Sequence, residues 1–130
     1  MAAGYNVLLR NAQLDAITTF AGNAAKLRIY DGTQPATGGA ATTLLAEFTL
    51  GSPFAAGAAA GVLSPTLPSN VVGLAASTAT WFRVVKADGT TQVIDGSAGT
   101  GAEQLVLNSA TISIGVAVSV TSWTITRGNA

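Results

Sequence analysis

Apolar side chains recur at every second residue in several short runs, and this pattern constrains the fold of the chain more than any other. Leu27 and Ile29 alternate with their neighbours in the run 26–30, and a longer alternation extends from Ile112 to Val120. Turn-forming residues such as glycine, asparagine and proline separate the runs. Alternation of this kind is typical of strands that bury one face. We therefore predict a mainly β fold of about seven or eight short strands, a jelly-roll-like β-sandwich.

The stretch from Asn6 to Phe20 differs, because its apolar residues have the period of a helix. The pair Gly22-Asn23 is predicted to end this helix. Two separate apolar stripes lie on it, one formed by Leu9, Ala12, Ala16 and Phe20 and the other by Val7, Leu14, Ile17 and Ala21. A surface helix needs one stripe for its own core, so either the small domain wraps the helix or another molecule covers the second stripe. We expect residues 1–23 to form a helical segment and residues 24–130 a β-sandwich, together one domain.

The segments between residues 44 and 78 have less uniform patterns. Residues 44–50 alternate and predict a half-buried strand. Residues 51–61 are rich in alanine and glycine, and we expect an extended segment or strand that packs closely against another backbone. The prolines of residues 64–68 break the chain, and residues 70–78 are expected to hold a short turn or helix.

A hairpin is predicted where two apolar runs, 81–86 and 91–94, flank the turn dipeptide Asp88-Gly89. A two-residue turn at this position places Val84 opposite Val93 and Arg83 opposite Ile94. One face of the hairpin then carries Phe82, Val84 and Val93, and the other carries Trp81, Arg83, Val85 and Ile94. Since neither face is simply polar, the second face either lies inside the sandwich, with Arg83 reaching solvent at its rim, or meets a partner. Our candidate interface residues are Trp81, Arg83, Val85 and Ile94.

The C-terminal third predicts further strands. Leu105–Leu107 forms a short apolar run that ends at Asn108-Ser109. The apolar alternation changes parity between Val120 and Trp123, and a shift of one residue moves side chains to the opposite face of a sheet. We therefore expect a bulge or turn near residues 121–122, and a further turn at Gly115.

Histidine and cysteine are absent, and the 130 residues include only six basic and six acidic side chains. General acid–base catalysis near neutral pH, transition-metal binding and thiol chemistry depend on these missing or scarce groups. We therefore predict no catalytic residues, no cofactor, no metal site and no enzymatic activity.

Three patterns that resemble ligand sites have simpler explanations. Residues 96–101 are rich in glycine but lack the lysine of a phosphate-binding loop, so a mobile loop is expected. Asp31, Asp88 and Asp95 each precede a glycine, so turn geometry is expected to explain these carboxylates. The aromatic residues could form a sugar-binding platform, but their scarcity favours a place in the core; they are Tyr30, Phe54, Trp81 and Trp123.

Charge and hydropathy limit the expected partners. The basic residues are scattered, so we expect no nucleic-acid binding. The chain has no apolar run long enough to span a bilayer and no secretory signal at its start, so we expect no membrane association and synthesis in a cytoplasm. The formal net charge is zero, which does little to keep copies apart in solution. This favours a component of an assembly, and we expect a homo-oligomer, a dimer or trimer.

Two stretches, KLRIYDGTQP at 26–35 and WFRVVKADGTTQVIDGSAGTGAEQLVLNSATISIGVAVSVTSWTIT at 81–126, resemble the cement, or decoration, proteins of tailed bacteriophages. The resemblance is one of run and spacing, and it extends from about Leu27 to Arg127. It implies a jelly-roll-like domain on the capsid exterior that homo-oligomerises, binds the major capsid protein and stabilises the head. The protein would be made in the host cytoplasm. The alternatives are a tail, baseplate or head–tail junction protein, and a carbohydrate-binding adhesion β-sandwich.

Overall fold

The computed structural model describes residues 4–126, which form one helix and twelve strands, so the fold is mainly β as predicted. The helix, α1, spans Val7–Ala21. The strands are β1 (Lys26–Tyr30), β2 (Leu44–Thr49), β3 (Val62–Leu63), β4 (Val71–Val72), β5 (Ser77–Thr78), β6 (Trp81–Val85), β7 (Gln92–Gly99), β8 (Leu105–Leu107), β9 (Thr111–Ile112), β10 (Ala117–Val118), β11 (Val120–Trp123) and β12 (Ile125–Thr126).

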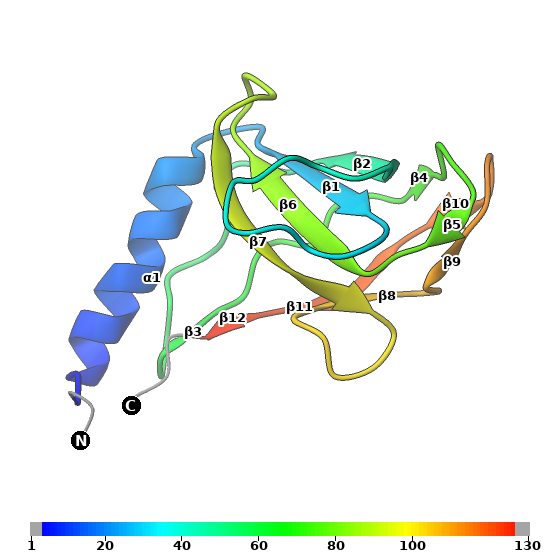
Figure 1. Ribbon diagram of the computed structural model, residues 1–130. Helices are drawn as coiled ribbons and strands as arrows, with labels where there is room; N and C mark the ends of the chain where they lie inside the picture. Colours follow the sequence, from blue (N-terminus) through cyan, green and yellow to red (C-terminus); the bar gives the residue numbers. More distant parts are fainter. Residues whose placement is uncertain (1–3, 127–130) are drawn as a thin grey trace.

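Six of the strands form one curled sheet in the order β11-β8-β7-β6-β1-β2. Its neighbours are antiparallel except for β7 and β8, which are parallel. Three two-stranded pairs, β10-β4, β12-β3 and β5-β9, complete the body. The helix α1 lies along one side of this body, and β4, β5, β9 and β10 lie at the opposite end (Figure 1).

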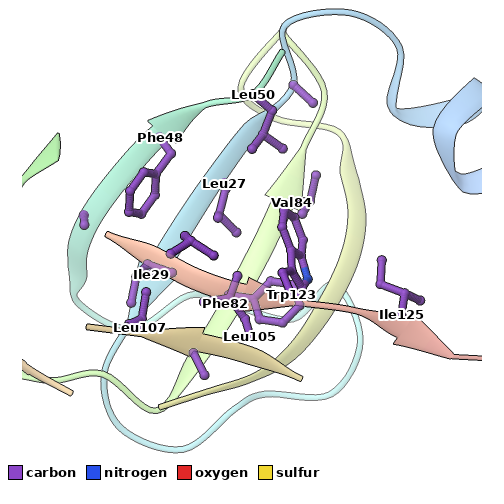
Figure 2. Close-up of a cluster of buried hydrophobic side chains, with 14 of the residues drawn as sticks. Leu27, Ile29, Phe48, Leu50, Phe82, Val84, Leu105, Leu107, Trp123 and Ile125 are labelled. Atoms are coloured by element: carbon purple, nitrogen blue, oxygen red, sulfur yellow. The ribbon is translucent and has the colours of Figure 1, made fainter. Parts of the chain in front are cut away.

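The core fills the space inside the curl, where side chains of β1, β2 and β6 point toward β8 and β11 (Figure 2). The Trp123 ring packs edge-on against Phe54 and against Phe82, with ring centroids 5.5 Å apart in each pair. Leu14 and Ala21 of α1 belong to the same buried cluster. Tyr30, Phe54, Trp81 and Trp123 are all buried, so the core interpretation of these aromatic residues is confirmed.

Both ends of α1 follow from local sequence. The Asn6 side chain accepts a hydrogen bond of 2.8 Å from the Leu8 amide, which satisfies one of the free N–H groups of the first turn. Gly22 follows the helix with a φ of +70°, a left-handed conformation that glycine adopts without strain. The predicted end at Gly22-Asn23 is confirmed.

The expected irregularities of the C-terminal third are also confirmed. The pairing of β11 with β8 shifts register between Val120 and Ser122, which lets both Val120 and Trp123 face the core. Gly115 adopts a φ of +75° between β9 and β10, as a turn at this position requires.

The predicted hairpin register is wrong by one residue. Arg83 pairs with Asp95 and Val84 with Ile94, so Ile94 shares a face with Val84 and lies on the face opposite to Arg83. Next to the turn the predicted register holds, since Val85 pairs with Gln92 and the Lys86 amide donates to the Thr91 carbonyl. The shift comes from a bulge at Val93, between the pairs Val85–Gln92 and Val84–Ile94. Asp95 therefore lies within β7, and turn geometry does not explain it.

Two segments differ from their predictions. Residues 51–61 form bends joined by isolated bridges, with no close backbone neighbour at Gly51 or Gly57, where an added Cβ would meet open space. Proline and glycine disfavour a continuous strand here. Residues 70–78 contain the short strands β4 and β5 in place of the expected turn or helix, and the β-branched Val71 and Val72 pair with β10.

Candidate interaction surfaces

Four charged side chains form a row across the sheet, one from each of four adjacent strands. Glu47 of β2 pairs with Arg28 of β1, Arg28 with Arg83 of β6, and Arg83 with Asp95 of β7. The Arg28 Nε lies 2.7 Å from a Glu47 oxygen, and the Arg83 Nε lies 2.7 Å from Asp95 Oδ1. Each arginine therefore has its carboxylate on the outer side of the row, which keeps the two cations separately compensated.

The pair at Arg83 is largely buried, with side chains of Arg83 and Asp95 that are 10% and 2% exposed. A second nitrogen of the Arg83 guanidinium, Nη2, donates to Asp95 and to the Gly39 carbonyl. The Gly38 amide also donates to Asp95. Burial by itself raises the pKa of Asp95, but the hydrogen bonds from Arg83 and Gly38 outweigh it, so this pKa lies below its ordinary value. The pair thus fastens the loop 31–43 to the sheet.

The same loop also covers Trp81 on this face of the hairpin. The Trp81 indole N–H donates to the Asp31 carbonyl at 2.9 Å, and the ring stacks on Tyr30 with centroids 4.4 Å apart. Trp81 and Val85 are 0% and 2% exposed. The predicted interface of Trp81, Arg83, Val85 and Ile94 is therefore wrong as a surface, because Trp81, Arg83 and Val85 are buried within the chain itself and Ile94 lies on the other face.

The remaining candidate groups have structural partners. The hydroxyl and amide of Thr91 and the amide of Thr90 hold the pKa of Asp88 well below its usual range. The Asp31 carboxylate accepts from the Thr43 amide. Residues 96–99 belong to β7, so only the end of the glycine-rich segment is a loop, and there Glu103 accepts from the Gly101 amide.

A shallow hollow of about 300 Å³ lies between the end of α1 and the hairpin loop, lined by residues 21–23 and 86–88. Its charged members are Lys86 and Asp88, and the Asp88 carboxylate already binds the hairpin loop. Within residues 4–126, no three acidic side chains gather as a metal site would require. Over the same range, no helix is both long and apolar enough to cross a membrane.

The helix α1 presents its apolar residues outward. Its outward face consists of Leu8, Leu9, Ala12, Ala16, Thr19 and Phe20, all of which are exposed and uncharged. Leu8 is 72% exposed, and Leu9 and Phe20 are each about half exposed, at 48% and 49%. This face contains one of the two predicted stripes, so the domain does not wrap the helix.

Polar side chains of α1 point toward the body instead. The Asn11 side chain accepts a hydrogen bond from the Gly61 amide at 2.9 Å, and Asp15 accepts from the Ala58 amide at 2.8 Å. Leu14 and Ala21 complete the inner side of the helix. The helix is thus apolar on both sides, whereas the outer side of an ordinary surface helix is polar, and its outward face is a candidate interaction surface.

A second apolar surface lies at the end of the molecule opposite α1 (Figure 1). It consists of Val72, Leu74, Ile114 and Val116, which are 52%, 54%, 70% and 57% exposed. The segments that carry them are joined by backbone hydrogen bonds, from the Gly73 amide to the Val116 carbonyl and from the Gly115 amide to the Gly73 carbonyl. We call this surface the apolar tip.

The apolar tip was missed because Ile114 and Val116 belong to an alternating run that predicts burial. The signal that could have revealed it is Gly115 between them, since a turn there carries both neighbours to the end of the molecule. Comparisons with protein-family models, with curated proteins and with solved structures found no match to this chain. The two apolar surfaces are thus the basis for assigning a function.

Proposed function

We propose that this protein is a structural component of a phage virion, a cement or decoration protein that homo-oligomerises and binds the major capsid protein on the outside of the head. The observation that carries the proposal is a pair of uncharged apolar surfaces, the outward face of α1 and the apolar tip, at opposite ends of one small body. Two such surfaces allow one copy to contact two neighbours at once, as a protein that bridges subunits must.

The arrangement of charge supports the same function. The row of Glu47, Arg28, Arg83 and Asp95 directs four charged groups to internal pairing. Attachment through the apolar surfaces then depends on apolar burial, at about 25 cal/mol per Å², more than on ion pairs. Within the proposal, the curled sheet and its short strand pairs form a jelly-roll-like sandwich, which the enclosed core between β6 and β11 supports.

We assign the contact with the capsid protein to the apolar tip, and the experiment tests this contact. Purified capsids that lack the protein are mixed with wild-type protein or with an Ile114→Asp variant, and occupancy is measured by sedimentation. Because Ile114 is 70% exposed, the substitution leaves the fold intact. Loss of about 1.5 kcal/mol or more of apolar burial corresponds to at least a tenfold weaker attachment. Ala102→Asp, in an exposed loop away from the tip, is the matched control.

Two further results belong to this experiment. Wild-type occupancy is expected to change little between about 50 and 500 mM salt, although the screening length falls severalfold. Decorated particles are expected to withstand higher temperatures than undecorated ones. Equal particle stability with and without the protein, or salt-sensitive binding, would contradict the proposal, and binding to isolated tails instead of heads would favour the tail alternative. The sugar-binding alternative has little support, since the four aromatic residues proposed for it are buried.

A further inference from the structure

We propose that the outward face of α1 binds the same face of a second copy, with the two helices antiparallel. The helix pair is the contact that makes the oligomer, and in this sense it rests on the proposed function. Two observations on the helix point to a second copy as the occupant, its size pattern and its charge, and the area of the face sets the strength of the contact.

The side chains of the outward face are arranged symmetrically about the middle of the helix. The helix spans Val7–Ala21, so its centre is Leu14. Large side chains, Leu8 and Phe20, lie six residues to either side of this centre, and small ones, Ala12 and Ala16, lie two residues to either side. In an antiparallel pair about a two-fold axis, Leu8 therefore meets the partner helix at the level of Phe20, and Ala12 at the level of Ala16. A face of this kind is self-complementary, as an isologous interface requires.

Charge selects the antiparallel orientation. The Lys86 ammonium lies 4.4 Å from the centroid of the Phe20 ring, at one end of the face. A parallel pair would bring the two Lys86 ammonium groups to the same end, where they repel. An antiparallel pair separates them by about the length of the helix, roughly 22 Å for fifteen residues. It also aligns the two helix dipoles in opposite directions, which is favourable.

Area sets the strength of the contact. A face about 22 Å long and about 10 Å wide presents only a few hundred Å², less than the roughly 800 Å² per partner of a standard interface. The small side chains in the middle, Ala12 and Ala16, let the helices approach closely and improve their packing. We therefore expect a pair that dissociates in dilute solution and forms at high concentration or on a surface that gathers many copies.

The absence of cysteine makes disulfide trapping a clean test. Two variants, Ala12→Cys and Ala16→Cys, are prepared with different affinity tags so that the three possible dimers separate by mass. In the antiparallel pair, Cys at 12 faces Cys at 16 of the partner. Two Cys at 12 are offset by about 6 Å along the axis, four residues at 1.5 Å each. A disulfide requires Cα atoms within about 7 Å, so the offset disfavours the like pairs.

On mild oxidation at high protein concentration, the mixture is expected to give the mixed dimer at least fivefold faster than either variant alone gives its own dimer. An Ala102→Cys variant, exposed at a site away from α1, gives the background rate. Preferential dimers of Ala12→Cys with itself would overturn the antiparallel orientation, and mixed-dimer formation at the background rate would overturn the helix pair. Neither outcome affects capsid binding through the apolar tip, so failure of the helix pair and failure of the proposed function are distinguishable.

Discussion

Replacing Arg83 with alanine removes the cation from the most buried of the three ion pairs in the described residues. The Asp95 carboxylate, 2% exposed, then keeps the Gly38 amide as a donor but loses two hydrogen bonds from the guanidinium. The Gly39 carbonyl loses its donor as well. We expect the protein to fold but to be markedly less stable, and its loop 31–43 to lose much of its attachment to the sheet.

Removal of one partner from a buried ion pair costs about 3–5 kcal/mol, because the other charge stays buried without compensation. Since Asp95 retains the Gly38 amide, we expect the lower end, about 3 kcal/mol. For a chain of 130 residues, this lowers Tm by roughly 12 °C, at about 4 °C per kcal/mol.

The loss of unfolding free energy is measured by urea unfolding, which is followed by tryptophan fluorescence and by far-ultraviolet circular dichroism. The matched control is Arg28→Ala, because Arg28 is the direct cross-strand neighbour of Arg83 but its ion pair is more exposed, with side chains 23% and 31% accessible. Exposed pairs contribute about 0–1 kcal/mol, so this control is expected to lose about 1 kcal/mol.

The double variant Arg83→Ala with Asp95→Ala removes the uncompensated carboxylate, and it is expected to recover part of the loss. Equal losses for Arg83→Ala and Arg28→Ala, or a loss for Arg83→Ala below about 1 kcal/mol, would refute the reasoning. Either result would mean that the buried pair does not hold the loop.

Two further predictions concern pH and the apolar tip. The pKa of Asp95 is lowered in the folded protein, so its stabilisation is complete above the unfolded pKa of about 3.9 and is lost as the pH falls through the lower folded value. In urea titrations from neutral to acid pH, Asp95→Asn is therefore expected to lose less unfolding free energy at acid pH than the wild type. Equal losses would exclude Asp95 as a contributor. At Gly73 an added Cβ would lie 2.2 Å from the Ser113 carbonyl oxygen, so Gly73→Ala is expected to cost about 1–3 kcal/mol of stability and to reduce capsid occupancy. In the control Gly57→Ala the added Cβ meets open space, and neither stability nor occupancy is expected to change. A Gly73→Ala protein as stable as the wild type in thermal unfolding would contradict the close packing at the tip.

Sequence reasoning succeeded where a local pattern determines local structure. The alternation around Leu27 and Ile29 predicted β1, and the parity change before Trp123 predicted the register shift in β11. Gly22 and Gly115 adopt the left-handed conformations expected of them. In each case the responsible interactions lie within a few residues or follow directly from which face is buried.

Sequence reasoning failed where a side chain interacts over a long range or where a bulge interrupts the pairing of two strands. A bulge at Val93, between the pairs Val85–Gln92 and Val84–Ile94, shifts the hairpin by one residue and brings Asp95 opposite Arg83. The orientation of α1 depends on hydrogen bonds from residues 58 and 61, more than forty positions away in the chain. The helical period shows two apolar stripes but does not specify which of them the body covers.

The placement of charge explains why the exposed apolar surfaces persist in a folded protein. Most small soluble proteins keep charges outside, where they are hydrated and hold copies apart. Here Arg83 and Asp95 lie beneath a loop, and Asp15 binds the backbone of its own body, while Leu8 and Ile114 face outward. Each buried charge is compensated by a specific partner, so the body is held together by directional contacts that do not require the outer apolar residues. Those residues are therefore available for burial against other molecules without loss of the fold. A nearly uncharged surface is an advantage when it is buried against a partner in this way.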